Sequence, residues 1–222
     1  MGEESRVNTD YYFIMVSEIE FNIPQQSPNF IAGWYINEEI CDGLISFFEE
    51  SPDQKPGAIG KGVDKDFKTS TDVTVIPTNP DDRIQNYLKK LEEVCSNYIK
   101  KYPWCSINHS LWGINTNFNI QKYNPNEGFF GWHSERSTTV DLVSTRHLVF
   151  MTYLNNVTDG GETEWFFQQV KVQPRKGLTL IWPVDWTHTH RGVTSKTETK
   201  YITTGWYTYK IPNFDYTQYN GA

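Results

Sequence analysis

The spacing of hydrophobic and polar positions changes near residue 103. Before this point, two segments place apolar residues three and four positions apart, which is typical of amphipathic helices. After it, short apolar or alternating runs are separated by turn sequences, which is typical of strands. The pattern therefore predicts a mainly β protein with its helices in the N-terminal half.

The two predicted helices differ in strength. Residues 37–50 form a short amphipathic segment with two glutamates near its start. Residues 79–102 give the clearest helical pattern, because Asn79 can cap the helix, Pro80 suits its first position and one face is apolar. That face is expected to pack on a sheet. Between the helices, residues 51–68 are rich in Gly, Pro and Lys, lack periodicity and are predicted to form a mobile loop.

The strand signals define the fold class. An opening strand is predicted at residues 11–21, which are aromatic and β-branched. Later strands are predicted at 115–124, 129–135, 146–154, 162–167, 178–182, 187–193 and 199–209. Short strands following two helices predict an antiparallel double-sheet roll, a double-stranded β-helix or jelly-roll core, with helices on one face. The 222 residues suit one domain. In it, residues 1–105 would support a core at about 106–210.

Composition and charge narrow the possible partners. The formal net charge of −7 argues against binding to a nucleic-acid backbone, which requires clustered Lys and Arg. No apolar run is long enough to span a bilayer, and the polar N-terminus is unlike a secretory signal. Cys41, Cys95 and Cys105 form no CxxC pair and are predicted to be free thiols in a reducing compartment. We therefore expect a cytoplasmic protein without nucleic-acid or membrane partners.

The candidate chemistry begins in the stretch GWHSERSTTV, residues 131–140. His133 and Glu135 lie two positions apart in a predicted strand, so their side chains share a face and could bind one metal ion. Two histidines and one carboxylate with open positions are the ligand set of non-haem Fe(II) oxygenases. The stretch WTHTHRGV offers His188 or His190 as the third ligand. Both lie on one predicted strand face, so geometry does not choose between them.

One lysine adds to this pattern. In ETKYITTGWYTY, Lys200 shares a strand face with Thr204 and Trp206. Burying a lysine inside a β-barrel is costly unless its ammonium group meets an anion. A dicarboxylate cosubstrate would supply that anion.

These motifs resemble the 2-oxoglutarate- and Fe(II)-dependent dioxygenases, in particular the prolyl 4-hydroxylase branch. The resemblance covers about residues 68–209 and includes QKYNPNEGFFGWHSE, HLVFMTYLNNVTDGGETEW and KYITTGWY. In this family His-x-Asp is followed, several strands later, by a histidine and then by a basic residue ten positions on. That interval fits His190 and Lys200, so the resemblance assigns His190 as the third ligand. One departure is Glu135, which stands where the family usually has Asp and carries an extra methylene.

The resemblance also implies the remaining roles. Lys200 and Tyr153 would hold the distal carboxylate of 2-oxoglutarate, Tyr123 and Trp206 would line its pocket, and Thr204 would lie beside it. The implied cofactors are Fe(II), 2-oxoglutarate as cosubstrate and O2, with ascorbate as a candidate reductant. The implied reaction is hydroxylation of an unactivated C–H bond, with succinate and CO2 as products. The implied substrate is a peptidyl proline in a peptide or protein.

Several alternatives remain open. The same roll could be a non-catalytic module that binds a metal or a glycan, or an oxygenase acting on another side chain or a small molecule. A zinc hydrolase with the same three ligands is disfavoured, because it would leave Lys200 without a task and lacks an evident general base. Arg136 and Trp132 flank the ligands and are candidates for substrate contact. Residues 51–68 are the candidate closing loop.

Overall fold

The computed structural model describes residues 28–60, 62–139 and 141–214, so the strand predicted at residues 11–21 lies outside the described part of the chain. The helical elements are α1 (Glu38–Glu50), α2 (Asp82–Lys101) and the 3-10 turns η1 (Pro103–Cys105), η2 (Asp141–Thr145) and η3 (Trp186–His188). The strands are β1 (Ala32–Tyr35), β2 (Lys55–Pro56), β3 (Lys68–Thr69), β4 (Thr71–Val75), β5 (Trp112–Gly113), β6 (Phe118–Tyr123), β7 (Gly128–Phe129), β8 (Arg146–Tyr153), β9 (Thr163–Trp165), β10 (Val170–Val172), β11 (Leu178–Pro183), β12 (His190–Gly192) and β13 (Lys200–Tyr209). Neither α1 nor α2 has the length and apolar character that a membrane-spanning helix requires.

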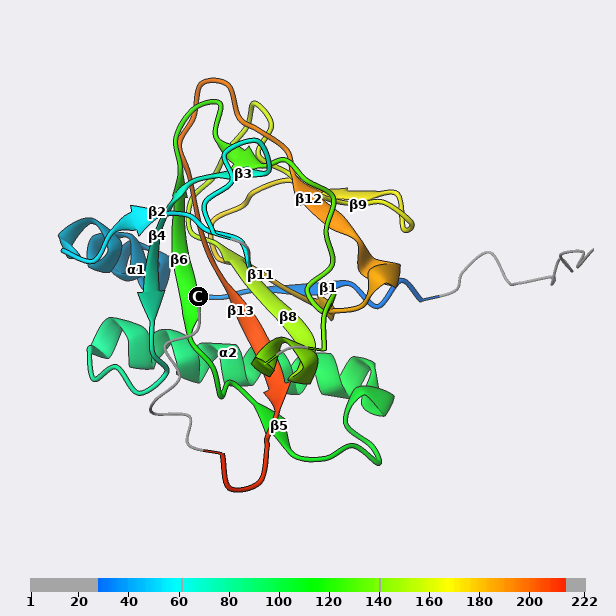
Figure 1. Ribbon diagram of the computed structural model, residues 1–222. Coiled ribbons are helices and arrows are strands. Elements are labelled where there is room, and N and C mark those ends of the chain that lie inside the picture. Colours follow the sequence, from blue (N-terminus) through cyan, green and yellow to red (C-terminus); the bar gives the residue numbers. More distant parts are fainter. Residues whose placement is uncertain (1–27, 61, 140, 215–222) are drawn as a thin grey trace, which may run out of the picture.

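The strands form two sheets that face each other and one small pair. The main sheet has the order β1-β11-β8-β13-β6-β4-β2, with β5 paired to β13. The minor sheet has the order β10-β9-β12, and β3 pairs with β7. All these pairs are antiparallel. The predicted double-sheet roll with flanking helices is therefore confirmed (Figure 1).

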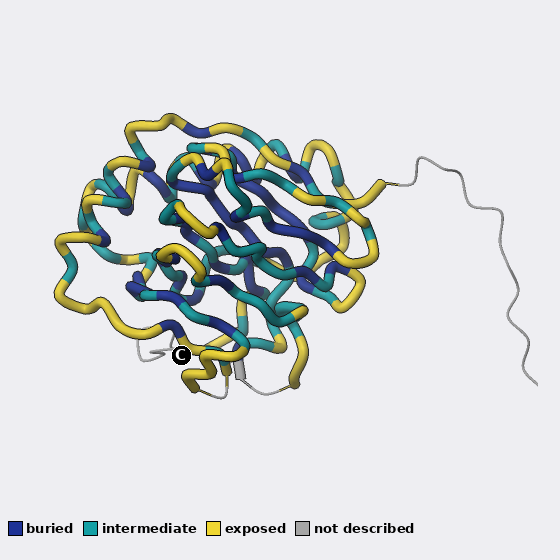
Figure 2. Tube along the Cα trace, turned by 90° about the horizontal axis from the view of Figure 1, so that it is seen from above, coloured by how far each residue is buried: buried dark blue, intermediate teal, exposed yellow. Residues whose placement is uncertain are grey.

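The main sheet separates two hydrophobic cores because its side chains alternate between its faces. On β8, Leu148 and Phe150 point to the core that contains α1 and α2, whereas Val149 and Met151 point to the core shared with the minor sheet. The buried chain in Figure 2 follows the strands through the interior, and the exposed chain lies around its periphery. The second core is the one that surrounds the candidate site, since it includes Tyr123, Tyr153, Trp165 and Trp182.

Both predicted helices are present and cover one face of the main sheet. Helix α2 buries an apolar stripe against it: Ile84, Tyr87, Leu91, Val94, Cys95 and Tyr98. The predicted cap of α2 was wrong. Asp81 caps the helix by accepting the backbone N–H of Arg83 at 2.9 Å, whereas Asn79 accepts the N–H of Asp81. The guanidinium of Arg83 also binds the Asp81 carboxylate. These contacts favour a helix that begins after Asp81 and not at Pro80.

Two predicted segments differ from the structure near the site. The strand expected at 129–135 ends at Phe129, because the backbone that follows bonds to several neighbours in turn. The N–H of Phe130 binds the carbonyl of Phe67, and that of Glu135 binds the carbonyl of Val184. The loop predicted at 51–68 is partly strand, since β2 pairs with β4 and Lys68 pairs with Phe129. A periodicity analysis misses strands of two residues such as these.

At Gly205, strand β13 packs tightly against the core that contains α1 and α2. A Cβ atom added there would lie 2.6 Å from Phe118 Cβ and 2.6 Å from Phe150 Cζ. Gly205→Ala is therefore expected to lower the free energy of unfolding by about 1–3 kcal/mol, measured by urea denaturation. Gly113→Ala is the control, because no atom lies within 4 Å of its added Cβ. An equal effect of both changes would contradict this packing.

Candidate metal centre

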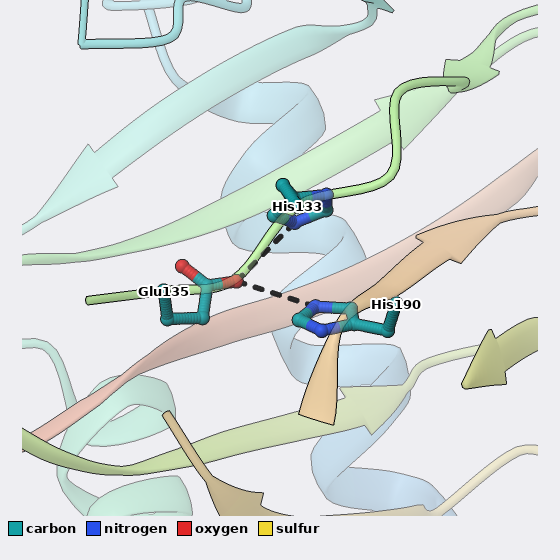
Figure 3. A group of neighbouring side chains, drawn as sticks. All are labelled: His133, Glu135 and His190. Carbon is teal, nitrogen blue, oxygen red and sulfur yellow. Dashed lines mark ion pairs between the residues drawn. The ribbon is translucent and has the colours of Figure 1, made fainter. Parts of the chain in front are cut away.

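Three side chains converge between the two sheets. His133 and Glu135 come from the irregular segment after β7, and His190 is the first residue of β12. One ligand atom from each residue lies within 4.8 Å of the other two. Oε1 of Glu135 is 3.4 Å from Nε2 of His133 and 3.4 Å from Nε2 of His190, as Figure 3 shows. This is the only such group of His, Cys, Asp or Glu among the described residues.

The backbone brings the two histidines together directly. His133 and His190 form an isolated antiparallel bridge. The N–H of His133 binds the carbonyl of His190 at 3.0 Å, and the reverse bond is 2.9 Å. Residues that exchange both hydrogen bonds lie directly opposite each other, with their side chains on the same face. The imidazole centroids are accordingly 4.4 Å apart.

The proton positions of both imidazoles are set by backbone carbonyls. Nδ1 of His133 lies 2.9 Å from the carbonyl of Gly131, and Nδ1 of His190 lies 2.9 Å from the carbonyl of His188. A carbonyl only accepts, so each neutral ring carries its proton on Nδ1. Each Nε2 is thus left as a lone-pair donor facing Glu135. Metal-binding histidines commonly have this arrangement, in which the second ring nitrogen binds a carbonyl or carboxylate.

The carboxylate of Glu135 is held at its other oxygen. Trp206 Nε1 donates to Oε2 at 3.0 Å, and Arg146 Nη1 lies 3.5 Å from the same oxygen. Arg146 also donates to the backbone carbonyl of Glu135 at 2.7 Å. Oε1 is consequently the oxygen turned towards the histidines. The three groups fit a divalent metal ion, because they offer two imidazole nitrogens and one carboxylate oxygen on one side and leave other positions open.

Electrostatics favour a charged carboxylate at this position. Burial by itself raises the pKa of Glu135, but the hydrogen bonds and positive charge that His133 and His190 supply when protonated outweigh burial and hold that pKa well below its usual value. Burial, reinforced by the charge of His133, lowers the pKa of His190. A neutral His190 and an ionised Glu135 are the forms that bind a metal.

Aromatic rings enclose the two histidines. The Phe129 ring stacks on His133 with centroids 3.8 Å apart and an interplanar angle of 7°. Trp182 and Trp165 contact the His190 ring with centroids at 5.1 and 6.1 Å. These rings restrict the imidazoles to one orientation and exclude water from around them. The sequence carries no specific signal for this role, because aromatic residues are common in β cores.

His188 was predicted to lie on a strand and to share a strand face with His190. The structure shows neither. His188 ends the 3-10 turn η3, and its Nε2 bonds to the carbonyl of Asn29 at 2.9 Å. The turn forms because the backbone N–H of His188 bonds to the carbonyl of Asp185. Of the two candidates, only His190 joins His133 and Glu135. His109 and His147 lie elsewhere, both in contact with Tyr209.

Lys200 is buried, and the described part of the chain offers it no counter-ion. It is 5% exposed, donates to the carbonyl of Gly161 at 3.0 Å and lies 4.9 Å from the centroid of the Tyr123 ring. Gly161 has a φ of 78°, a left-handed conformation that suits glycine and turns its carbonyl to the lysine. Among the described residues no carboxylate lies within ion-pair distance of Lys200. Burial lowers its pKa from 10.5 to about 8, an effect that the charge of Glu162 partly offsets.

A second buried lysine provides the contrast. Lys68 is 3% exposed, but its Nζ lies 2.7 Å from Asp72 Oδ2. The same carboxylate oxygen accepts from Gln121, which in turn accepts the hydroxyl of Tyr123 at 2.8 Å. This network fixes the ring on which Lys200 rests. Lys68 is therefore neutralised within the protein, whereas Lys200 has no such partner among the described residues.

The other predicted residues lie around the same core with varied contacts. The Tyr153 hydroxyl donates within the protein, with Thr163 Oγ1 at 2.7 Å and the carbonyl of Val172 at 3.1 Å. Thr204 donates to the carbonyl of Phe150 at 3.2 Å. To bind a cosubstrate, either hydroxyl must exchange one of these bonds.

Arg136 and Trp132 both engage residues of this chain. Arg136 pairs with Asp185 at 2.7 Å. Trp132 is 37% exposed, and the guanidinium of Arg191 lies 4.5 Å from its ring centroid. Arg146 is a contact residue of the centre that the sequence reasoning missed, because nothing in its own neighbourhood in sequence marks it.

Sequence comparison finds a likeness in the C-terminal half of the chain. Residues 118–208 match the model of the 2OG-Fe(II) oxygenase superfamily. The match contains all three residues of the centre together with Lys200, and it confirms the resemblance drawn from the motifs. The superfamily that matches this part of the chain is named for Fe(II) and 2-oxoglutarate (2OG). Comparison with curated proteins gave no match.

Several solved structures share the fold of this chain. A prolyl-4-hydroxylase from Pseudomonas putida has a TM-score of 0.61 at 14% identity, covering 82% of this chain and 94% of that one. A viral collagen prolyl hydroxylase from Paramecium Bursaria Chlorella virus-1, in complex with 2OG, has a TM-score of 0.60 at 17% identity, covering 82% and 97%. A prolyl hydroxylase from Trichoplax adhaerens, in complex with a peptide of the hypoxia inducible factor oxygen degradation domain, has a TM-score of 0.66 at 13% identity, covering 81% and 84%. At these identities the likeness establishes the common fold.

Lys200 should destabilise the folded protein in the absence of an anion, in a pH-dependent way. Its pKa is about 8 in the folded protein and 10.5 as a free side chain, so the unfolded chain holds the proton more tightly. The penalty is full below about pH 8 and is relieved as the pH rises towards 10.5, by up to roughly 3 kcal/mol. Lys200→Met should therefore raise the free energy of unfolding at pH 7 more than at about pH 9.5, measured by urea denaturation. A stability difference that is independent of pH would contradict the uncompensated charge.

Proposed function

We propose that this oxygenase couples the oxidative decarboxylation of 2-oxoglutarate to hydroxylation of a C–H bond in a peptide, with a peptidyl proline as the substrate position. The products would be succinate, CO2 and a hydroxylated residue such as 4-hydroxyproline. One observation supports this most directly: the three-residue ligand set and a buried ammonium group without an ion-pair partner among the described residues both contact rings of the core between the main and minor sheets.

In this proposal His133, Glu135 and His190 hold Fe(II). When bound, Fe(II) and 2-oxoglutarate supply the redox chemistry that activates O2. The chain's own residues position the reactants. The Gly131 and His188 carbonyls keep Nε2 of each histidine free of a proton, and Phe129, Trp165 and Trp182 exclude water from the rings.

Lys200 would bind the distal carboxylate of 2-oxoglutarate. Its Nζ reaches towards β12, since a Cβ atom added at Gly192, two residues after His190, would lie 3.6 Å from it. The ammonium group is thus close in the fold to the strand that carries a metal ligand. Tyr123 supports Lys200 from beneath, and Tyr153, Thr204 and Trp206 complete the proposed cosubstrate pocket. Burial strengthens the attraction between Lys200 and a carboxylate, because little water screens it.

The proline substrate rests on likeness to other proteins. Three solved structures with the same fold are named as prolyl hydroxylases, and one of them contains a peptide fragment. We propose Arg136 and Trp132 as the residues that contact the substrate. Residues 51–68 are the candidate closing loop, and ascorbate is the candidate reductant. We further propose that residues 1–105 support, and about 106–210 form, the core of one oxygenase domain, and that it acts in the cytoplasm.

Turnover tests this function against the rival readings. The protein is incubated anaerobically with Fe(II), then given 2-oxoglutarate, O2 and a panel of proline peptides, and succinate and a gain of one oxygen atom in the peptide are followed. We expect both products, formed in equal amounts and only when metal is present. His190→Ala is the matched inactive control, and His188→Ala should retain metal-dependent succinate formation.

Each of the other outcomes of this assay would favour one of the alternative functions. Succinate without a modified peptide would point to another side chain or a small molecule as substrate. Thermal stability unchanged by Fe(II) and 2-oxoglutarate, with no succinate, would contradict the enzyme proposal and favour a non-catalytic binding module.

Lys200→Ala should weaken 2-oxoglutarate binding far more than metal binding. Losing one charged contact to a carboxylate costs about 1.5–3 kcal/mol, or roughly 10- to 100-fold in affinity. Anaerobic calorimetry of the variant with Fe(II), followed by 2-oxoglutarate, measures the two affinities separately. Lys196→Ala is the control, because Lys196 is exposed and four residues away. Equal losses of metal and cosubstrate would mean that Lys200 acts structurally.

A further inference from the structure

We propose that Trp206 and Arg146 are positioning residues that restrict Glu135 to binding metal through one oxygen, and that this hold makes glutamate a better ligand here than aspartate. The proposal rests on the metal site of the proposed function and deepens it. It gives Trp206 a positioning role in addition to the pocket lining proposed above.

The two residues reach Glu135 from adjacent strands of the main sheet. Trp206 lies on β13 opposite Val149 of β8, and Arg146 is the first residue of β8. The guanidinium of Arg146 lies over the Trp206 indole, 3.4 Å from the ring centroid. Stacking at this distance fixes the plane of the indole and hence the direction of its N–H. The N–H points at Oε2 of Glu135, with the nitrogen 3.0 Å away.

The contacts with Trp206 and Arg146 give the two carboxylate oxygens of Glu135 different roles. Oε2 is engaged by Trp206 and approached by Arg146 at 3.5 Å, so Oε1 is the oxygen left for the metal. A carboxylate that bound through both oxygens would take up an additional coordination position. The two-histidine, one-carboxylate arrangement depends on open positions for the other reactants. Trp206 therefore keeps a position open without touching the metal.

The backbone of Glu135 explains why its length matters. Its N–H binds the carbonyl of Val184 at 3.0 Å, and its carbonyl accepts from Arg146 at 2.7 Å. The main chain is thus fixed on both sides and cannot advance to compensate for a shorter side chain. Aspartate would withdraw the carboxylate by about 1.5 Å, the length of one C–C bond. It could then reach Trp206 or the metal, but not both.

Cobalt binding tests the proposal with a readout independent of activity. Calorimetry under nitrogen gives the Co(II) affinity of the full chain, and the visible d–d spectrum reports the coordination of the ion. Trp206→Phe and Arg146→Gln should each weaken Co(II) binding about 10- to 100-fold, the range seen for residues that orient metal ligands. Both should lower the d–d absorption, because a released carboxylate adds its second oxygen and raises the coordination number. Trp186→Phe, at an exposed tryptophan, should change neither.

A double substitution tests whether Trp206 acts through Glu135. Glu135→Asp should also weaken Co(II) binding. Adding Trp206→Phe to it should weaken binding little further, because an aspartate that reaches the metal has already lost its contact with Trp206. Additive losses would overturn the proposed route, and tighter binding by Glu135→Asp would overturn the preference for glutamate. If Trp206→Phe does not fold, Arg146→Gln decides the same point.

The results also separate this proposal from the function it rests on. No Co(II) binding by the unaltered protein would remove the metal site itself. Normal binding by that protein, with unchanged affinity and spectrum in Trp206→Phe and Arg146→Gln, would leave the site intact and overturn only the positioning role.

Discussion

The candidate site depends on one backbone interaction, the pair of hydrogen bonds between His133 and His190. The two residues are far apart in sequence, and their reciprocal bonds of 3.0 and 2.9 Å place them directly opposite each other. Opposed residues of an antiparallel pair project their side chains from the same face, so both imidazoles enter the same space. Glu135 follows because its own N–H is bound to Val184, which holds its side chain on that face. Without this bridge the three ligand atoms would have no common centre.

The surrounding fold makes it possible to bury polar groups at this bridge. Burying Lys200, which has no counter-ion within the described residues, and burying the ligand set both cost stability. The core that contains α1 and α2 offsets that cost. It is apolar and is separated from the site by the main sheet. Lys68 shows how the same fold treats a lysine without such a task, since it is paired with Asp72 at 2.7 Å. The contrast between the two lysines is the clearest physical mark of a binding site in this chain.

The sequence predicted the parts of the structure that depend on local pattern. The apolar and β-branched runs of β8 and β13 and the apolar stripe of α2 were sufficient to place those elements, because the strands lie between two cores and the helix buries one face. Motif spacing was sufficient to nominate His133, Glu135, His190 and Lys200. The long strand expected at 129–135 was wrong, since its backbone bonds to three different neighbours and no periodicity encodes this.

Contacts that cross the sheet could not be predicted from the sequence. The strand face shared by His188 and His190 was wrong because a 3-10 turn rotates His188 away. The contacts of Arg146 and Trp206 with Glu135 could not be predicted, because they depend on the register between β8 and β13. Register is a property of paired strands, so it becomes visible only in the folded chain.

The most direct test of this account is an anaerobic crystal structure of the protein with Fe(II), located by its anomalous scattering. We predict one ion bound by Nε2 of His133, Nε2 of His190 and one oxygen of Glu135, at the distances of about 2.0–2.2 Å that nitrogen and oxygen ligands keep from a divalent metal of this size. An ion bound elsewhere, or a centre that lacks either histidine, would contradict the account.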